Sequence, residues 1–176
     1  TIGIYSYELF HFFDVENIMR IGSTGAMQEK VKLRDIVFGM GACTNSNYAS
    51  QYGLNGTFAP IASYVLLQEA IAQAQLSGAR YHVGNILSSD VFYNDDEAAN
   101  EGWRKMGVLC VEMEAAALYM NAARCGKNAL AMFTVSDSLV TGEATTAEER
   151  QNSFTQMMEI ALNTAVSLES YCSDRT

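Results

Sequence analysis

The sequence is poor in positive charge. Only 11 of its 176 residues are Lys or Arg, against 20 that are Asp or Glu, which gives a formal net charge of −9. This balance argues against a protein that binds the backbone of a nucleic acid, because such binding depends on dense basic side chains. A small phosphate ligand stays compatible with it, since a few cationic groups in one pocket are enough.

Histidine, paired cysteines and long apolar runs are also scarce. His11, His82 and the four cysteines form neither a C-x-x-C pair nor a cluster with zinc spacing, so we expect no metal and reduced thiols. No apolar run reaches the ~20 residues that span a bilayer, and no signal peptide precedes the first helix pattern. The sequence therefore predicts a soluble, cytoplasmic protein without a membrane partner. Because only 18% of residues are charged, it also favours a surface partly covered by another subunit.

Short apolar runs alternate with longer helical patterns. We expect strands at 16–22, 33–43, 81–87, 107–113 and 128–136, and helices at 3–13, 61–77, 114–126 and 146–171. Pro60 and Gly78 bound the second helix, and Thr146-Ala-Glu-Glu149 matches a capping box at the start of the last one. Apolar, β-branched strands between helices predict an α/β fold with a largely buried sheet, and no domain boundary is visible.

Four polar stretches follow predicted strands: RIGSTGA, SSDVFYN, VEME and VSD. Ligands of α/β sheets bind beyond the carboxyl ends of strands, so these stretches are candidate site segments. In the first, Arg20 precedes a Gly-Ser-Thr-Gly turn whose side chains and backbone N–H groups suit phosphate or carboxylate oxygens. The alternative for that segment is an ordinary tight turn with an exposed arginine.

The second stretch, SSDVFYN, fits a planar base, and the third, VEME, fits a sugar. Glu112 and Glu114 would share one face of a strand, and a carboxylate there can accept hydrogen bonds from both hydroxyls of a vicinal diol. Met113 beside them offers apolar contact to a sugar. Phe92 and Tyr93 could stack on a base. The alternatives are acids favoured near a helix N-terminus and aromatics that pin a loop to the core.

Asp137 in the fourth stretch follows the apolar run LAMFTV. Partial desolvation there favours the protonated acid, which can donate to a ring nitrogen and then act as a general acid. Arg150 lies on the next predicted element and could assist the ionised form. The alternative is that Asp137 is a turn or cap residue.

Together and in this order, these segments resemble the bacterial-type, hexameric purine nucleoside phosphorylases of the nucleoside phosphorylase superfamily. The matching stretches are IGIYSYEL, RIGSTGA, KLRDIVFGMGACT, VGNILSSDVFYN, GVLCVEMEAAALY, TVSD and TTAEERQNSF. The resemblance implies a three-layer α/β/α fold with a central mixed β-sheet flanked by helices. It also implies a homohexamer built as a trimer of dimers. The implied reaction is phosphorolysis of purine nucleosides to free base and ribose 1-phosphate. It uses inorganic phosphate as co-substrate and neither metal nor organic cofactor.

The resemblance also implies a role for each candidate residue. Arg20 and Ser23 would bind phosphate, Met113 and Glu114 the ribose, and Phe92, Val111 and Ser136 the base. Asp137 would protonate purine N7, and Arg150 would move in to assist it. These roles agree with the chemistry, because breaking the glycosidic bond leaves positive charge on the ribosyl group and negative charge on the base.

The chain also departs from the family pattern. It begins inside a family signature, with Thr1 where serine is usual, and lacks the G-D-P-x-R phosphate loop of the N-terminal part. We therefore expect residues 1–176 to form a single, N-terminally incomplete phosphorylase domain. The alternatives are a uridine phosphorylase or nucleosidase of the same superfamily, and an inactive fragment or non-catalytic oligomer partner. The TTAEERQ stretch after Asp137 favours the purine branch.

Overall fold

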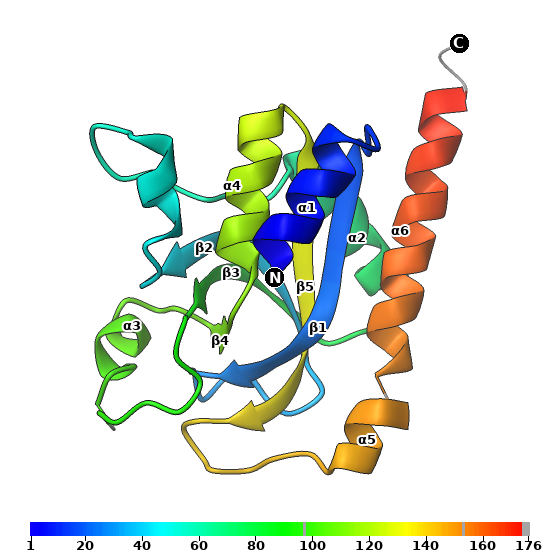
Figure 1. Ribbon diagram of the computed structural model, residues 1–176. Coiled ribbons are helices and arrows are strands. Elements are labelled where there is room, and N and C mark those ends of the chain that lie inside the picture. The colour runs from blue at the N-terminus through cyan, green and yellow to red at the C-terminus, as the bar shows by residue number, and fades with distance from the viewer. Residues whose placement is uncertain (97, 153, 174–176) are drawn as a thin grey trace.

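The computed structural model describes residues 1–96, 98–152 and 154–173 (Figure 1). Its sheet contains β1 (Asn17–Ala26), β2 (Ile36–Thr44), β3 (Tyr81–Ser88), β4 (Cys110–Glu112) and β5 (Asn128–Ser138). The spatial order is β1-β4-β3-β2-β5, and the outer strands β1 and β5 pair with each other, so the sheet closes on itself. Parallel pairs (β1–β5, β2–β3, β3–β4) and antiparallel pairs (β1–β4, β2–β5) are both present, which confirms a mixed sheet.

Helices cover both faces of this sheet. The helical elements are α1 (Ile2–His11), the 3₁₀-helix η1 (Tyr48–Tyr52), α2 (Tyr64–Leu76), α3 (Glu101–Lys105), α4 (Ala115–Cys125), α5 (Ala147–Asn152) and α6 (Thr155–Ser173). Helix α1 packs against α4, and α2 packs against α6 (Figure 1). The three-layer arrangement expected from the resemblance is therefore confirmed.

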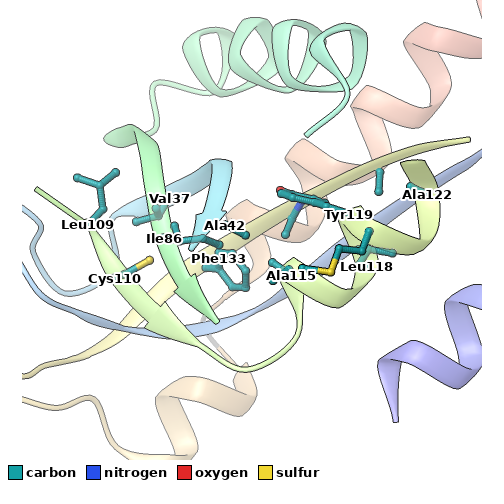
Figure 2. Close-up of a cluster of buried hydrophobic side chains, with 14 of the residues drawn as sticks. Val37, Ala42, Ile86, Leu109, Cys110, Ala115, Leu118, Tyr119, Ala122 and Phe133 are labelled. Carbon is teal, nitrogen blue, oxygen red and sulfur yellow. The ribbon is translucent and has the colours of Figure 1, made fainter. Parts of the chain in front are cut away.

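Strand β5 shows why both faces need helices. Ala131 and Phe133 join the hydrophobic cluster with α4, whereas Leu130 and Met132 join the cluster with α2 and α6. Alternate residues of a strand point to opposite faces, so this all-apolar run is buried on both sides. Figure 2 shows the first cluster, in which side chains of α4 meet those of the strands. Tyr119 of α4 anchors it, because its hydroxyl donates to the carbonyl of Gly39 at 2.5 Å and accepts from the N–H of Ala131 at 2.9 Å.

The Gly-Ser-Thr-Gly segment is part of a strand, so the prediction of a turn there was wrong. Strand β1 runs through it to Ala26, and Ser23 and Thr24 pair with Thr134 and Val135 of β5. A register shift between Thr24 and Gly25 is the only trace of irregularity in this pairing. Glycine favours turns locally, but here pairing with a distant strand decides the conformation.

The predicted last helix, 146–171, consists of two helices. Helix α5 ends at Asn152 and α6 begins at Thr155. Phe154 lies between them and is buried in the second core cluster with Met157 and Ile160. The capping box is confirmed: the Glu149 N–H donates to Thr146 Oγ1 at 3.1 Å and the Thr146 N–H donates to Glu149 Oε2 at 3.0 Å.

Other element boundaries differ by a few residues. Helix α2 starts at Tyr64 rather than directly after Pro60, because the Pro60 carbonyl accepts from Ala42 of β2. Gly78 follows the end of α2 in the left-handed conformation, with φ +67°, as expected of a glycine that ends a helix. Helix α3 was not predicted. Within the part of the chain that the structure describes, no helix is both long and apolar enough to cross a bilayer.

Candidate functional site

Arg20 of β1 reaches the start of α4. Its Nη2 atom forms an ion pair with the Glu114 carboxylate and lies 4.0 Å from Glu112 Oε2, and the guanidinium sits 5.1 Å from the ring centroid of Phe133. A Cβ atom on Gly22 would lie 2.5 Å from Arg20 Nη1, so glycine at this position leaves room for the guanidinium. Among the described residues, Nη1 is buried and has no hydrogen-bond acceptor. An anion beside Arg20 would satisfy it.

Glu112 is a structural acid rather than a partner of Glu114. Its carboxylate accepts the N–H groups of Glu114 at 2.8 Å and Ala115 at 3.0 Å, and also the hydroxyl of Ser88. It therefore caps α4, the alternative that the sequence left open for one of the two acids. Burial raises the pKa of Glu112, while its hydrogen bonds and the charge of Arg20 act in the opposite direction.

Glu114 is left free of that capping role and faces Arg20. It is the N-cap residue of α4, with φ −136° and ψ −27°, so it stands outside the strand that ends at Glu112. The expectation that both acids share one strand face was wrong, because the chain turns into α4 between them. The result separates a buried acid that holds the helix from a half-buried acid that can reach a ligand.

Met113 lies between these acids and borders a cavity of about 830 Å³. The cavity wall also includes Thr44 and Ser88 from the ends of β2 and β3, together with residues of α1, η1 and α4. Met113 is 41% exposed, so its side chain is open to a ligand in that space. The volume falls within the range of small-molecule sites.

Asp137 belongs to β5 and is half-buried, so it is a strand residue and not one that follows the strand. Ser136 Oγ donates to Asp137 Oδ1 at 2.6 Å. A Cβ atom built on Gly25 would lie 2.9 Å from Asp137 Oδ2 and 3.6 Å from Val111 Cγ1. The missing side chain of Gly25 therefore lets Asp137, Ser136 and Val111 converge at one point of the sheet.

Arg150 lies near this group without touching Asp137. Its Nη1 donates to the Thr145 carbonyl at 3.0 Å, and among the described residues it forms no ion pair with Asp137. Thr145 is buried and its N–H and hydroxyl both donate to the Ser136 carbonyl, at 2.7 Å and 2.9 Å. Asp137 and Arg150 are thus connected through two intermediate residues, Ser136 and Thr145.

Within the described part of the chain, no hydrogen bond or ring contact joins Ser23 or Phe92 to either group. Ser23 is exposed on β1. Phe92 is 74% exposed in the loop after β3, and its ring meets that of Tyr93 edge-on with centroids 4.8 Å apart. The structure therefore brings together Arg20 with Glu114, and Asp137 with Ser136 and Val111. It leaves Ser23, Phe92 and Arg150 outside those contacts.

Two residues that support these groups were not singled out from the sequence. Ser88 pairs in register with Glu112, so the end of β3 supports the end of β4. Thr24 ties two members of the Asp137 group together, because its hydroxyl donates to the Val111 carbonyl at 2.7 Å and its own carbonyl accepts from Ser136 Oγ at 3.3 Å. The SSD stretch after a strand was a usable signal for Ser88. The role of Thr24 could be recognised only once the pairing of β1 with its neighbouring strands was known.

The chain is similar to proteins of one known family. Residues 2–168 match the profile of the family described as Phosphorylase superfamily. A DeoD-type purine nucleoside phosphorylase of Clostridium novyi is 52% identical over 166 residues, covering 94% of this chain and 71% of that protein. The protein of the same name from Clostridium beijerinckii is 51% identical over 169 residues, covering 96% and 71%. That of Tolumonas auensis is 47% identical over 166 residues, covering 94% and 70%.

Proposed function

Because this chain belongs to the phosphorylase superfamily, we propose that it serves purine nucleoside phosphorolysis. Inorganic phosphate attacks C1′ of the nucleoside, the N-glycosidic bond breaks, and the products are a free purine and ribose 1-phosphate. The observation that carries the proposal is the Arg20–Glu114 ion pair next to Met113, which borders the cavity. The same chain places the Asp137 carboxylate against Gly25. The names of the similar proteins support the purine branch.

At the phosphate end, Arg20 and Ser23 hold the nucleophile. Arg20 offers the buried Nη1 donor, which finds no acceptor among the described groups. A phosphate dianion competes with Glu114 for the guanidinium and releases the Glu114 carboxylate toward the ribose hydroxyls. Glu114 and the phosphate then stand near the positive charge that develops on the ribosyl group, while Met113 contacts the sugar face.

At the base end, Phe92, Val111 and Ser136 border the purine and Asp137 gives its proton to N7. The proton neutralises the negative charge that the leaving base acquires, so the interaction is stronger in the transition state than in the bound nucleoside. Arg150 approaches the aspartate and favours its ionised form, which promotes proton transfer. In the arrangement described, this step requires Arg150 to leave the Thr145 carbonyl.

We further propose that phosphate is the co-substrate and that neither a metal nor an organic cofactor takes part. Prolonged dialysis against a chelator is expected to leave the rate of phosphorolysis unchanged. A loss of activity that added divalent metal restores would contradict this.

A homohexamer in the cytoplasm, arranged as a trimer of dimers, completes the proposal. Exposed apolar side chains on and just after α1 support contact with another subunit: Ile4, Tyr5, Tyr7, Leu9, Phe12 and Phe13. Light scattering of the protein that contains this chain is expected to give a mass of six subunits, and a monomer at working concentration would contradict the assembly.

The test of the function is release of purine base from inosine and adenosine, with and without phosphate. We expect release only with phosphate and little turnover of uridine. Release without phosphate would instead indicate a nucleosidase, preferred uridine turnover a uridine phosphorylase, and no release a non-catalytic protein.

Asp137→Asn tests the mechanism. It is expected to lower kcat on inosine by about 10²- to 10⁴-fold, the usual contribution of general acid catalysis. Turnover of 7-methylguanosine should change far less, because its base already carries positive charge and leaves without a proton. Equal losses on both nucleosides would contradict the general-acid role.

A further inference from the structure

An ion pair ties helix α5 to the body of the protein. Arg34 Nη2 binds Glu149 Oε1, and Arg34 stands in the turn that precedes β2. Glu149 is the capping-box acid of α5 and directly precedes Arg150. We call this Arg34–Glu149 pair the tether.

The body end of the tether is rigid. The Arg34 N–H donates to the Val135 carbonyl at 2.9 Å, and the Val135 N–H donates to the Asp35 carbonyl at 2.9 Å. The turn is thereby bound to β5 two residues before Asp137. Arg34 also has φ +70°, a conformation that side chains other than glycine rarely adopt and that persists only where the surroundings enforce it.

Asp35 supplies that enforcement. It is only 5% exposed, and its Oδ2 accepts the Lys32 N–H at 2.9 Å and lies 2.8 Å from His82 Nε2 and 3.2 Å from Arg80 Nε. Three neighbours on one buried oxygen fix the turn. Arg34 is therefore a projecting cation on a fixed support.

The other end of the tether is held weakly. None of residues 147–150 is buried, and among the described elements α5 packs extensively against no helix or strand. What holds its first turn is the capping box, the hydrogen bond from Arg150 to Thr145, and the tether. The Thr146 N–H and then Arg34 hold the pKa of Glu149 below its ordinary value, so this acid stays ionised at neutral pH.

From this arrangement we infer that Arg34 is a positioning residue for Arg150. The tether holds Glu149 beside the part of β5 that carries Asp137. It thereby keeps α5 within reach of Asp137 while the Arg150 side chain leaves the Thr145 carbonyl and binds the Asp137 carboxylate. The inference rests on the proposed function, since it concerns the assistance that Arg150 gives to proton transfer. It adds Arg34, a residue that contacts neither the substrate nor Asp137.

Arg34→Gln and Glu149→Gln each remove the tether with little other change. Arg34→Gln keeps an unbranched side chain at the strained backbone position, and glutamine at 149 can still accept in the capping box. Each variant is expected to lower kcat on inosine by up to about fivefold, the range that an exposed ion pair supports, without a matching change in KM. The double variant should show no further loss.

Three controls isolate the role. Glu148→Gln removes a charge from the same first turn of α5 and should leave kcat unchanged, since Glu148 is not the acid bound to Arg34. Turnover of 7-methylguanosine, which needs no proton, should be unaffected by loss of the tether. In an Arg150→Ala background, Arg34→Gln should have no effect on kcat.

Amide hydrogen exchange of residues 147–150 gives a readout that does not depend on activity. Exchange should be faster in Arg34→Gln than in the wild type or Glu148→Gln. The inference is overturned if exchange in α5 is unchanged, if inosine and 7-methylguanosine lose rate equally, or if the effect persists without Arg150. A wild-type protein that releases no purine would instead overturn the proposed function, and hydrogen exchange would still test the tether.

Discussion

At the scale of single residues, Gly25 matters for the side chain that it lacks. A Cβ atom there would lie 2.6 Å from Leu139 Cδ1 and 2.9 Å from Asp137 Oδ2. Both atoms end flexible side chains, and Gly25 is not among the glycines with positive φ, so alanine can enter β1 only by moving the carboxylate. We expect Gly25→Ala to lower kcat on inosine by about tenfold or more, because small misplacements of a catalytic group are costly. The cost in stability should be about 1 kcal/mol, typical of shifted rotamers.

The matched control is Gly102→Ala in α3, where a Cβ atom meets nothing within 4 Å. Steady-state kinetics on inosine and urea unfolding of both variants make the comparison. If Gly25→Ala retained full activity, Asp137 would not act from the position that the structure gives it.

At the scale of elements, the sequence predicted what is local. The capping box at Thr146 and the glycine after α2 were predicted correctly, since each depends on neighbours a few residues away. The Gly-Ser-Thr-Gly segment was misread because its strand conformation comes from pairing with β5, more than 100 residues later. The break before α6 likewise follows from burial of Phe154 in the distant core.

The same division applies to the candidate site. Arg20, Glu114 and Asp137 could be proposed from residue type and from their place after apolar runs. The separate roles of Glu112 and Glu114 could not, because they depend on where β4 ends and on the partner that the register gives Glu112 in Ser88.

The different roles of Glu112 and Glu114 lead to a prediction about the stability that each gives to α4. Glu112→Ala removes the acceptor of two backbone N–H groups and of a buried hydroxyl, and should lower the free energy of unfolding by about 2–4 kcal/mol. Glu114→Ala breaks a partly exposed ion pair and should cost about 1 kcal/mol or less. Urea unfolding followed by circular dichroism measures both. Equal losses would mean that Glu112 does not cap the helix.

At the scale of the whole molecule, one pairing in the closed sheet is short: Gly25 and Ala26 of β1 pair with Val111 and Cys110 of β4, and we call this pairing the seam. Cys110 is fully buried in the main core cluster, and the Met27 N–H donates to the Leu109 carbonyl beside it at 2.9 Å. Burial raises the pKa of Cys110 to about 12. Its thiol is thus doubly protected, by lack of access and by lack of the reactive thiolate.

Cys110 should therefore report unfolding of the entire molecule. With a thiol reagent at pH 8, the buried thiol stays protonated while the protein is folded, so modification requires opening of the core. We expect its rate, measured by mass spectrometry of the Cys110 peptide, to rise with urea as steeply as global unfolding does. Cys43 and Cys125 are half-buried and should react earlier. Modification of Cys110 that depends little on urea would show instead that the seam opens without global unfolding. The pairing of β1 with β4 beside the Asp137 group would then be the least stable part of the closed sheet.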